Sequence, residues 1–224
     1  MLHDPALVVG TNYLGGYYEK SFSPAGNGQR KVRVLHELTR RYMEPHRRYH
    51  TMRHVMKMFD TAAFLGMELD DAQLWAIWCH DVVYKIPASP GDNEDESAEF
   101  CAYYMEEAGL SNEEVARAQR MIRATAYVLG DRIPDIDQEQ WMIVGLDLYG
   151  FGDRCSYESS AILLREEFGH LTDAQWNRYR TELLNKLRNR PYIVYPTFFG
   201  NEPNYHAWHQ RAWGNIDREL QELE

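Results

Sequence analysis

The chain has 224 residues, 44% of them hydrophobic and 13% aromatic, which is enough for a single domain with a substantial core. No stretch reaches the roughly 18 apolar residues of a membrane-spanning helix, and the first residues hold no run typical of a signal peptide. We therefore expect a soluble, cytoplasmic protein with no membrane partner. Cys79, Cys101 and Cys155 are odd in number and lack close-paired spacing, which argues against a disulfide framework or a zinc finger and predicts reduced, buried thiols.

The formal net charge of -10 is unevenly distributed along the chain. Residues 30–57 hold nine basic and two acidic side chains, a local charge of +7, which leaves -17 for the rest. A basic patch of this kind can attract a small anion, whereas the acidic remainder would repel duplex DNA. The same basic residues would also suit a solvated helix face. The charge pattern thus argues against duplex nucleic acid as a partner and leaves a small anion open.

The first half of the chain reads as helices after an irregular start. Residues 1–28 have no clear period. Apolar residues recur at helical spacing over 30–42 and over about 49–65, where Gly66 is typical of a helix end. A third helix is expected from 70–71 into 80–84, and it is apolar nearly all round. Such a helix belongs in the middle of a helical bundle.

The second half continues in the same manner. Breaker residues predict irregular segments at 85–93, at 130–137 and, in extended form, at 190–196. Further helices are expected at 92–109, at 111–129 with a capping box at Ser111 and Glu114, at 141–149, within 156–190 on either side of 169–172 with Thr172 as N-cap, and at 202–224. The sequence therefore predicts an all-α protein. We expect an N-terminal arm (1–29), a main helical domain (30–195) and a C-terminal extension with a helix packed on it (196–224).

Several polar residues within this apolar framework suit a metal ion. His50 and His54 are four residues apart, so on one helix their imidazoles would share a face, one binding a metal and the other handling a substrate. His80 and Asp81 end the buried third helix, where an unpartnered carboxylate is costly and a bound cation would remove that cost. A hydrogen-bonded core pair, or a helix end that emerges into water, would explain the same dipeptide.

Other candidate residues allow two interpretations each. Asp147 stands in an otherwise apolar segment and needs either a hydrogen-bonding partner or a cation. The acids that begin the helix at 92 suit its dipole, although Glu94 could instead reach a water molecule at the metal. Tyr49, Tyr84 and Trp78 could stack on a nucleobase, but aromatic residues in helices commonly belong to the core.

Taken together, these segments resemble a known superfamily. Its signature is the order H, HD, D on successive helices, and the matching segments are Tyr49-His50-Thr-Met-Arg-His54, Trp78-Cys79-His80-Asp81, Asp92-Asn93-Glu94 and Asp147-Leu148. The chain resembles the HD-domain metal-dependent phosphohydrolases. Residues 190–195 and 211–220 are similar to the tail of the bacterial branch described as predicted metal-dependent HD superfamily phosphohydrolases. The resemblance covers roughly residues 30–222 and implies a single HD-type helical bundle with the metal site between its central helices.

The resemblance also implies roles for individual residues. It implies that His54, His80, Asp81 and Asp147 bind a divalent metal ion (Mn, Fe, Co, Ni, Zn or Mg) and that His50 protonates the leaving oxygen. Two neutral imidazoles and two carboxylates suit such an ion and leave two octahedral positions for water and a phosphoryl oxygen.

Further residues are expected to assist. We expect Arg47 and Arg48 to hold phosphoryl oxygens, Glu94 to orient the nucleophile and Tyr84 to contact the substrate. Dinuclear relatives often carry another histidine near the places of Tyr127 and Val128, so whether a second metal binds stays open.

The favoured function is a metal-dependent phosphohydrolase that cleaves a phosphate ester or phosphoanhydride of a small phosphorylated compound, above all a nucleotide. Two alternatives remain. One is an HD-fold oxygenase with two irons, which requires further ligands. The other is a nucleotide-sensing or structural HD protein that holds a metal without turnover. The sequence leaves the metal's identity and a homo-oligomeric state open.

Overall fold

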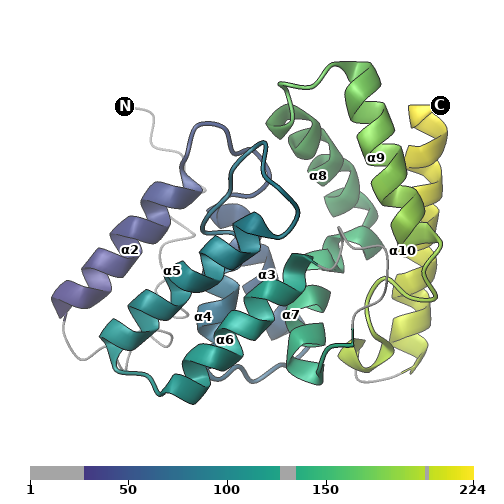
Figure 1. The fold of residues 1–224 in the computed structure, drawn as a ribbon. Helices are drawn as coiled ribbons and strands as arrows, with labels where there is room; N and C mark the ends of the chain where they lie inside the picture. The colour runs from purple at the N-terminus through teal and green to yellow at the C-terminus, as the bar shows by residue number, and fades with distance from the viewer. Residues whose placement is uncertain (1–27, 127–134, 200–201) are drawn as a thin grey trace.

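The computed structural model describes residues 28–126, 135–199 and 202–224. Within these ranges the regular structure is helical and contains no strand, which confirms the all-α prediction (Figure 1). No helix in the described ranges combines the length and hydrophobicity needed to cross a membrane. The expected N-terminal arm and most of the turn at 130–137 lie outside these ranges, as do Tyr127 and Val128.

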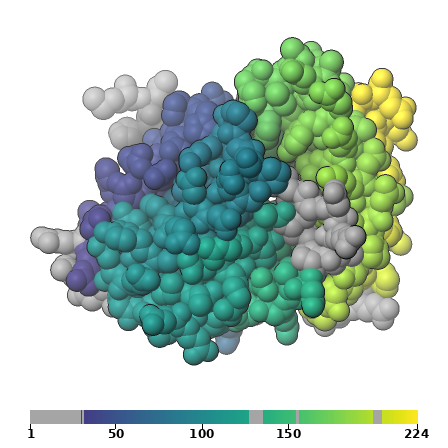
Figure 2. Space-filling view, viewed as in Figure 1, coloured from purple at the N-terminus to yellow at the C-terminus, as the bar shows by residue number. Residues whose placement is uncertain are grey.

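The helices follow one another with short connections. In chain order they are α2 (Gly28–Tyr42), α3 (Met52–Phe64), α4 (Asp71–Cys79), α5 (Asp92–Ala108), α6 (Asn112–Ala124), α7 (Gln138–Leu148), η3 (Tyr149–Gly152), α8 (Arg154–Glu167), α9 (Asp173–Arg188), η4 (Pro196–Phe199) and α10 (Glu202–Leu223). Figure 2 shows the same face with side chains filled in, where α5 and α6 (teal) and α9 (green) form neighbouring parts of the surface.

Helix α4 lies at the centre of the molecule. It contacts α3, α5, α6 and α7, and its side chains from Leu74 to Cys79 have no exposed surface. A helix that is apolar all round has no face to offer to water, so it is stable only when neighbours cover every side. The predicted burial of this segment is confirmed. Its cysteine, Cys79, and Cys101 on α5 are both buried free thiols, as expected.

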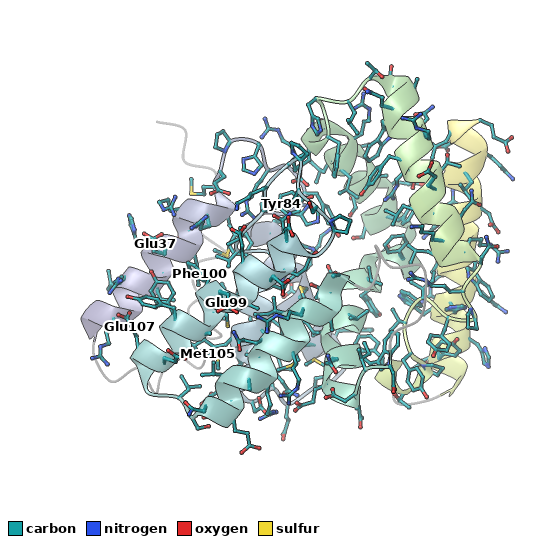
Figure 3. The ribbon with its side chains drawn as sticks, in the orientation of Figure 1. Glu37, Tyr84, Glu99, Phe100, Met105 and Glu107 are labelled. Atoms are coloured by element: carbon teal, nitrogen blue, oxygen red, sulfur yellow. The ribbon has the colours of Figure 1, made fainter. Side chains whose placement is uncertain are left out.

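Helix α2 lies beside α5 (Figure 3), and two of its basic residues contact α5 while Val34, Leu38 and Tyr42 enter the core. Arg33 donates hydrogen bonds to Tyr103 Oη at 3.1 Å and to Glu107 Oε1 at 3.3 Å. The Arg41 guanidinium lies 5.9 Å from the ring centroid of Phe100. Part of the basic stretch therefore makes contacts within the fold.

Capping chemistry sets several of the helix starts. Reciprocal side-chain and backbone hydrogen bonds of the capping-box type begin α4, α6, α7 and α9, and those of α6 and α9 use the predicted Ser111 and Thr172. Gly109 ends α5 in the left-handed region with φ 85°, which glycine adopts without steric cost. The starts of α4, α6, α7 and α9 and the end of α5 are thus fixed by local sequence.

Helices α3 and α4 are shorter than predicted, and both differences occur next to the polar residues. Helix α3 begins at Met52, because the backbone N–H groups of residues 48–50 bond to the Glu167 carboxylate. Helix α4 ends at Cys79, where the prediction continued it to Tyr84. His50 and His54 therefore do not share a helix, and that prediction is wrong.

Candidate metal centre

Four polar residues meet where α3, α4 and α7 pack together. His54 lies in the first turn of α3, His80 caps the C-terminal end of α4, Asp81 follows it, and Asp147 is next to last in α7. The two histidines are 4% and 1% exposed, so their rings are removed from bulk water. The apolar sequence of α4 is what carries a histidine and a carboxylate to this depth.

The distances between their donor atoms fit a single cation. His80 Nε2 lies 2.9 Å from Asp81 Oδ2, and His54 Nε2 lies 3.7 Å from the same oxygen. The candidate ligand atoms of His54, His80 and Asp81 all lie within 4.8 Å of one another. Two ligands each about 2.1 Å from one ion stand about 3 to 4 Å apart, as these atoms do. The three residues therefore make a possible metal-binding triad.

Asp147 reaches this group from the other side of His54. Its Oδ1 lies 3.0 Å from His54 Nε2, and its side chain is 17% exposed. It stays outside the set of donors that are all within 4.8 Å of one another. The structure thus brings the distal aspartate to the first histidine across 93 residues of sequence, while its convergence with His80 and Asp81 on one ion stays a prediction.

The ring of His80 offers the clearest test of whether a cation fits. Its Nδ1–H donates to the Ile77 carbonyl at 2.9 Å, so the neutral ring carries its lone pair on Nε2. That Nε2 is buried and makes no hydrogen bond among the described residues, although the Asp81 carboxylate is only 2.9 Å away. A lone pair facing a carboxylate is repulsive unless a positive charge stands between them. In metal sites, a ligating histidine commonly donates its other ring N–H to a backbone carbonyl, which fixes the orientation of the ring.

A proton can supply that positive charge in place of a metal. Burial lowers the pKa of His80, but Asp81 more than offsets it and raises the pKa to about 9. Burial raises the pKa of Asp81, and His80 and His50 outweigh it, so the carboxyl stays ionised. For His54, burial dominates and lowers the pKa. The cluster therefore holds negative charge and requires a cation, either a proton on His80 or a bound metal.

His50 lies outside the triad and is held by a residue that the sequence did not single out. Glu167, at the end of α8, receives the His50 Nδ1–H at 2.5 Å on Oε1, and its Oε2 accepts three successive backbone N–H groups, those of Arg48, Tyr49 and His50, at 2.7 to 3.0 Å. Burial raises the pKa of Glu167, but these hydrogen bonds outweigh it and lower the pKa to about 2. The His50 ring stacks on Tyr84 with centroids 4.2 Å apart, and its centroid is 5.9 Å from that of His54.

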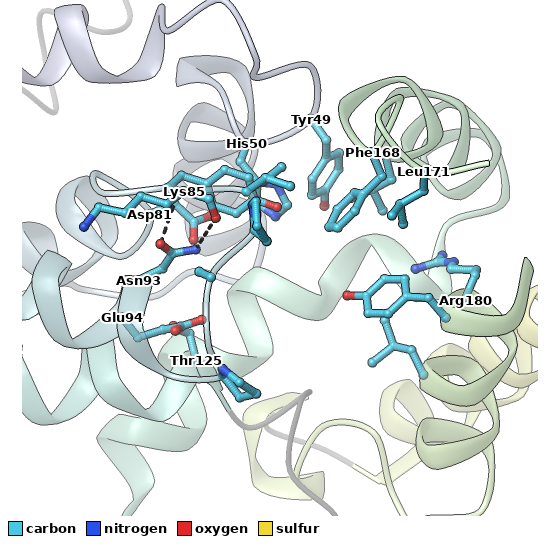
Figure 4. A pocket seen from close by; sticks show the side chains of 18 of the residues that line it. Tyr49, His50, Asp81, Lys85, Asn93, Glu94, Thr125, Phe168, Leu171 and Arg180 are labelled. Carbon is cyan, nitrogen blue, oxygen red and sulfur yellow. Dashed lines mark hydrogen bonds between the residues drawn. The ribbon is translucent and has the colours of Figure 1, made fainter. Parts of the chain in front are cut away.

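A cavity of about 420 Å³ opens beside the metal-binding triad (Figure 4). His50, Asp81 and Glu94 line one side, and α8, α9 and the segment between them supply the other, which is largely apolar and includes Arg180 and His170. The loop 85–90 forms the rim, and its start is fixed by Asn93, whose amide bridges Lys85 N at 2.9 Å and Lys85 O at 3.1 Å. The cavity thus joins a polar wall to an apolar one.

The apolar wall is an aromatic cluster. Phe168 stacks on Tyr179 with centroids 5.4 Å apart and lies 5.6 Å from Trp176. All three line the cavity together with Tyr84, the residue predicted to contact a substrate. An aromatic or other planar group would find stacking partners here.

Glu94 lines the same cavity, as the hypothesis for its role requires. Burial raises the pKa of its carboxyl above the ordinary value, and the nearby carboxylates add to the effect. Its position and its shifted pKa are consistent with a group that handles protons.

Arg47 and Arg48 have other roles than the predicted one. Arg47 is 3% exposed and donates to the carbonyls of His50, Asp81 and Val82 at 3.1, 2.6 and 2.9 Å. Arg48 donates to the carbonyls of Pro45 and Arg47 and does not line the cavity. These guanidinium groups support the loops that carry the site. The expectation that they hold phosphoryl oxygens is not met by this geometry.

Comparisons with known proteins add no relative. No protein-family model, no curated protein and no solved structure matches the chain. The likeness to HD-domain phosphohydrolases therefore stays an expectation from the sequence motifs.

Proposed function

We propose that the chain is a metal-dependent phosphohydrolase that cleaves a phosphate ester or phosphoanhydride of a small compound carrying an aromatic group, with a nucleotide as the favoured substrate. The observation that carries the proposal is the buried Nε2 of His80. It faces the Asp81 carboxylate without a hydrogen bond, beside His54, and Asp81 in turn lines a cavity large enough for a small molecule.

The donor set supports a divalent transition ion. His54, His80 and Asp81, with Asp147 beside them, would hold it through two imidazoles and two carboxylates. When bound, such an ion supplies a Lewis acid that polarises a phosphoryl oxygen and makes a water molecule more acidic.

Two protein groups then handle protons. His50 is oriented by Glu167 through Nδ1, which leaves Nε2 as the atom that can donate a proton to the leaving oxygen. Glu94 faces the cavity from the start of α5 and would orient the attacking water. The aromatic cluster of Phe168, Trp176 and Tyr179 would hold the leaving group's ring and exclude water from it.

The deciding experiment combines metal analysis with a substrate screen. The purified chain is loaded with Mn, Fe, Co, Ni, Zn or Mg, quantified for bound metal and incubated with nucleoside mono-, di- and triphosphates. We expect release of phosphate or pyrophosphate that requires both the metal and His54. A chelated sample and the His54→Ala variant serve as controls.

The alternatives give different results in the same assay. Two irons per chain would favour an oxygenase. One tightly held metal with no turnover of any nucleotide would favour a sensing or structural protein, and failure of every metal to bind would remove the proposal.

A further inference from the structure

A second cavity, of about 390 Å³, lies next to the proposed metal-binding residues His54 and Asp147. It shares Tyr49, His54 and Asp147 with the surroundings of the triad, and α3 and the start of α8 supply much of the rest of its wall. Two cationic side chains one helical turn apart, Arg53 and Lys57, line it. The cations of the aromatic cavity differ from these two, because Lys85 and Arg180 are already paired with the carboxylates of Glu96 and Glu219.

These two cations are available to a ligand. Among the described residues neither Arg53 nor Lys57 forms an ion pair, whereas Arg47 and Arg48, discussed above, are engaged with carbonyl groups. Lys57 Nζ donates to Ser156 Oγ at 2.9 Å. Burial and the nearby Arg53 lower the pKa of Lys57, which indicates a partly desolvated ammonium group.

The hydroxyl of Ser156 adds a third donor. The Ser156 oxygen accepts the hydrogen bond from Lys57, so the hydroxyl hydrogen remains to be donated. Among the described residues, no hydrogen bond has this hydroxyl as its donor. A guanidinium, an ammonium and a hydroxyl group on one cavity wall are the donors that a phosphate-like oxyanion needs.

The carboxylates in the same cavity oppose the binding of an anion unless a metal ion is bound nearby. Asp60, Asp147 and Asp153 also line it, so its formal charge is -1 with the two cations counted. A divalent ion between His54 and Asp147 would change this balance to +1. An oxyanion should therefore bind best when the neighbouring metal site is filled, and by linkage it should strengthen metal binding to the same degree.

We propose that this second cavity binds a phosphate-like oxyanion through Arg53, Lys57 and Ser156. The inference rests on the proposed function, since the oxyanion would be the substrate's phosphoryl group or the phosphate released from it. It replaces Arg47 and Arg48 as anion-binding residues with two cations that line the same cavity as His54 and Asp147.

The test measures the binding of inorganic phosphate to the full chain by calorimetry, with the metal content of each sample determined in parallel. We expect Arg53→Met and Lys57→Met each to weaken phosphate binding about tenfold or more, as for the loss of a charged hydrogen bond, with the metal retained. Lys85→Met removes the same charge from the aromatic cavity, where Lys85 is paired with Glu96 at 2.5 Å, and should bind phosphate as the wild type does.

The outcomes separate the two proposals. Retained metal with phosphate binding that is absent, or unaffected by Arg53→Met and Lys57→Met, overturns the oxyanion site and leaves the phosphohydrolase proposal standing. Phosphate binding that depends on Lys57 in a chain that holds no metal supports the oxyanion site and removes the phosphohydrolase proposal. A stronger effect of Lys85→Met than of Lys57→Met places the anion in the other cavity and overturns the inference.

A competition arm identifies the source of the oxyanion. If glycerol 1-phosphate displaces inorganic phosphate and depends equally on Lys57, the cavity receives the phosphoryl group of a monoester. If only inorganic phosphate binds, the cavity receives free phosphate, which is the product. Both results support the oxyanion site.

Discussion

Two buried polar clusters in this molecule have opposite electrostatic designs. In the C-terminal half, Arg180 on α9 donates to both carboxylate oxygens of Glu219 on α10, at 2.7 and 3.1 Å, and the Tyr157 hydroxyl bonds to the same carboxylate. In the candidate metal-binding triad, His80 and Asp81 face each other without a hydrogen bond. The first cluster neutralises itself, and the second needs an added cation.

The difference separates a structural role from a ligand-binding one. A buried charge is tolerated when its partner and hydrogen bonds are supplied within the fold, as they are for Glu219. The carboxylate of Asp81 is partly buried beside imidazoles, and no arginine or lysine among the described residues forms an ion pair with it, so its charge calls for a proton or a metal. The following predictions test whether the two clusters differ in this way.

The largest effect is expected for the ligands themselves. His54→Ala and His80→Ala should lose the metal and lower kcat/KM by roughly 10⁴-fold, or about 5 kcal/mol, because the Lewis acid is removed. Elemental analysis and initial rates on the purified variants check this. The control is His36→Ala, whose side chain is 73% exposed on α2, and it should behave as the wild type. Full metal retention in His80→Ala would show that the two clusters are alike.

The structural cluster should respond in stability and leave metal binding unchanged. Glu219→Ala should lower the free energy of unfolding by about 3 to 5 kcal/mol, because Arg180 is left buried without its partner. The double variant Arg180→Met with Glu219→Met should be more stable than Glu219→Ala, since no unpaired charge remains. Urea unfolding monitored by circular dichroism measures both. If the single and double variants lose the same free energy of unfolding, the pairing of Arg180 with Glu219 is not what stabilises this cluster.

Sequence patterns predicted the helices far better than they predicted the site. Periodicity and caps are local, so the helix starts predicted at Ser111 and Thr172 agree with the structure. The contact of Glu167 with His50 joins residues 117 positions apart, and no local pattern encodes it. One signal was present: Glu167 is an acid in the last turn of a helix, where the helix dipole disfavours negative charge, and such a residue needs a reason to be there. The burial of Arg47 likewise depends on carbonyl groups that only the folded loops expose.

His50 should act on turnover while metal binding persists. His50→Ala is expected to keep its metal and lower kcat about 100-fold, or about 3 kcal/mol, for a lost general acid. The loss should shrink for a nitrophenyl phosphate, whose leaving group hardly needs protonation. Parallel metal analysis and rates with an alkyl and a nitrophenyl ester test it. A metal-free His50→Ala would exchange the roles of His50 and His54.

A third buried histidine, His209 on α10, extends the comparison to a ring that is hydrogen-bonded to the backbone. Its Nε2 accepts the Ile193 N–H at 3.0 Å, and burial, assisted by His206 and Arg188, lowers its pKa to about 4. Between pH 6.5 and 4 the unfolded chain then binds more protons, so stability falls as the pH falls. The wild type should lose roughly 1 to 3 kcal/mol more over this range than His209→Gln. Urea titrations at each pH give the free energy of unfolding of both proteins. If this free energy falls equally with pH in the wild type and in His209→Gln, His209 is not held neutral by its backbone hydrogen bond.

The smallest effect is expected for Glu167, which acts through His50 and touches no proposed ligand of the metal. Glu167→Gln keeps an oxygen for the backbone N–H groups but removes the charge that favours protonated His50. We expect kcat to fall about tenfold, or about 1.4 kcal/mol, with the metal content unchanged. Because Glu167 raises the pKa of His50, its loss should shift the basic limb of the pH–rate profile to lower pH. Glu166→Gln removes the same charge from an exposed neighbour and should leave the profile in place. A slower enzyme with an unshifted basic limb would mean that Glu167 only holds the loop and does not tune His50, so that the cluster around His50 belongs with the structural one.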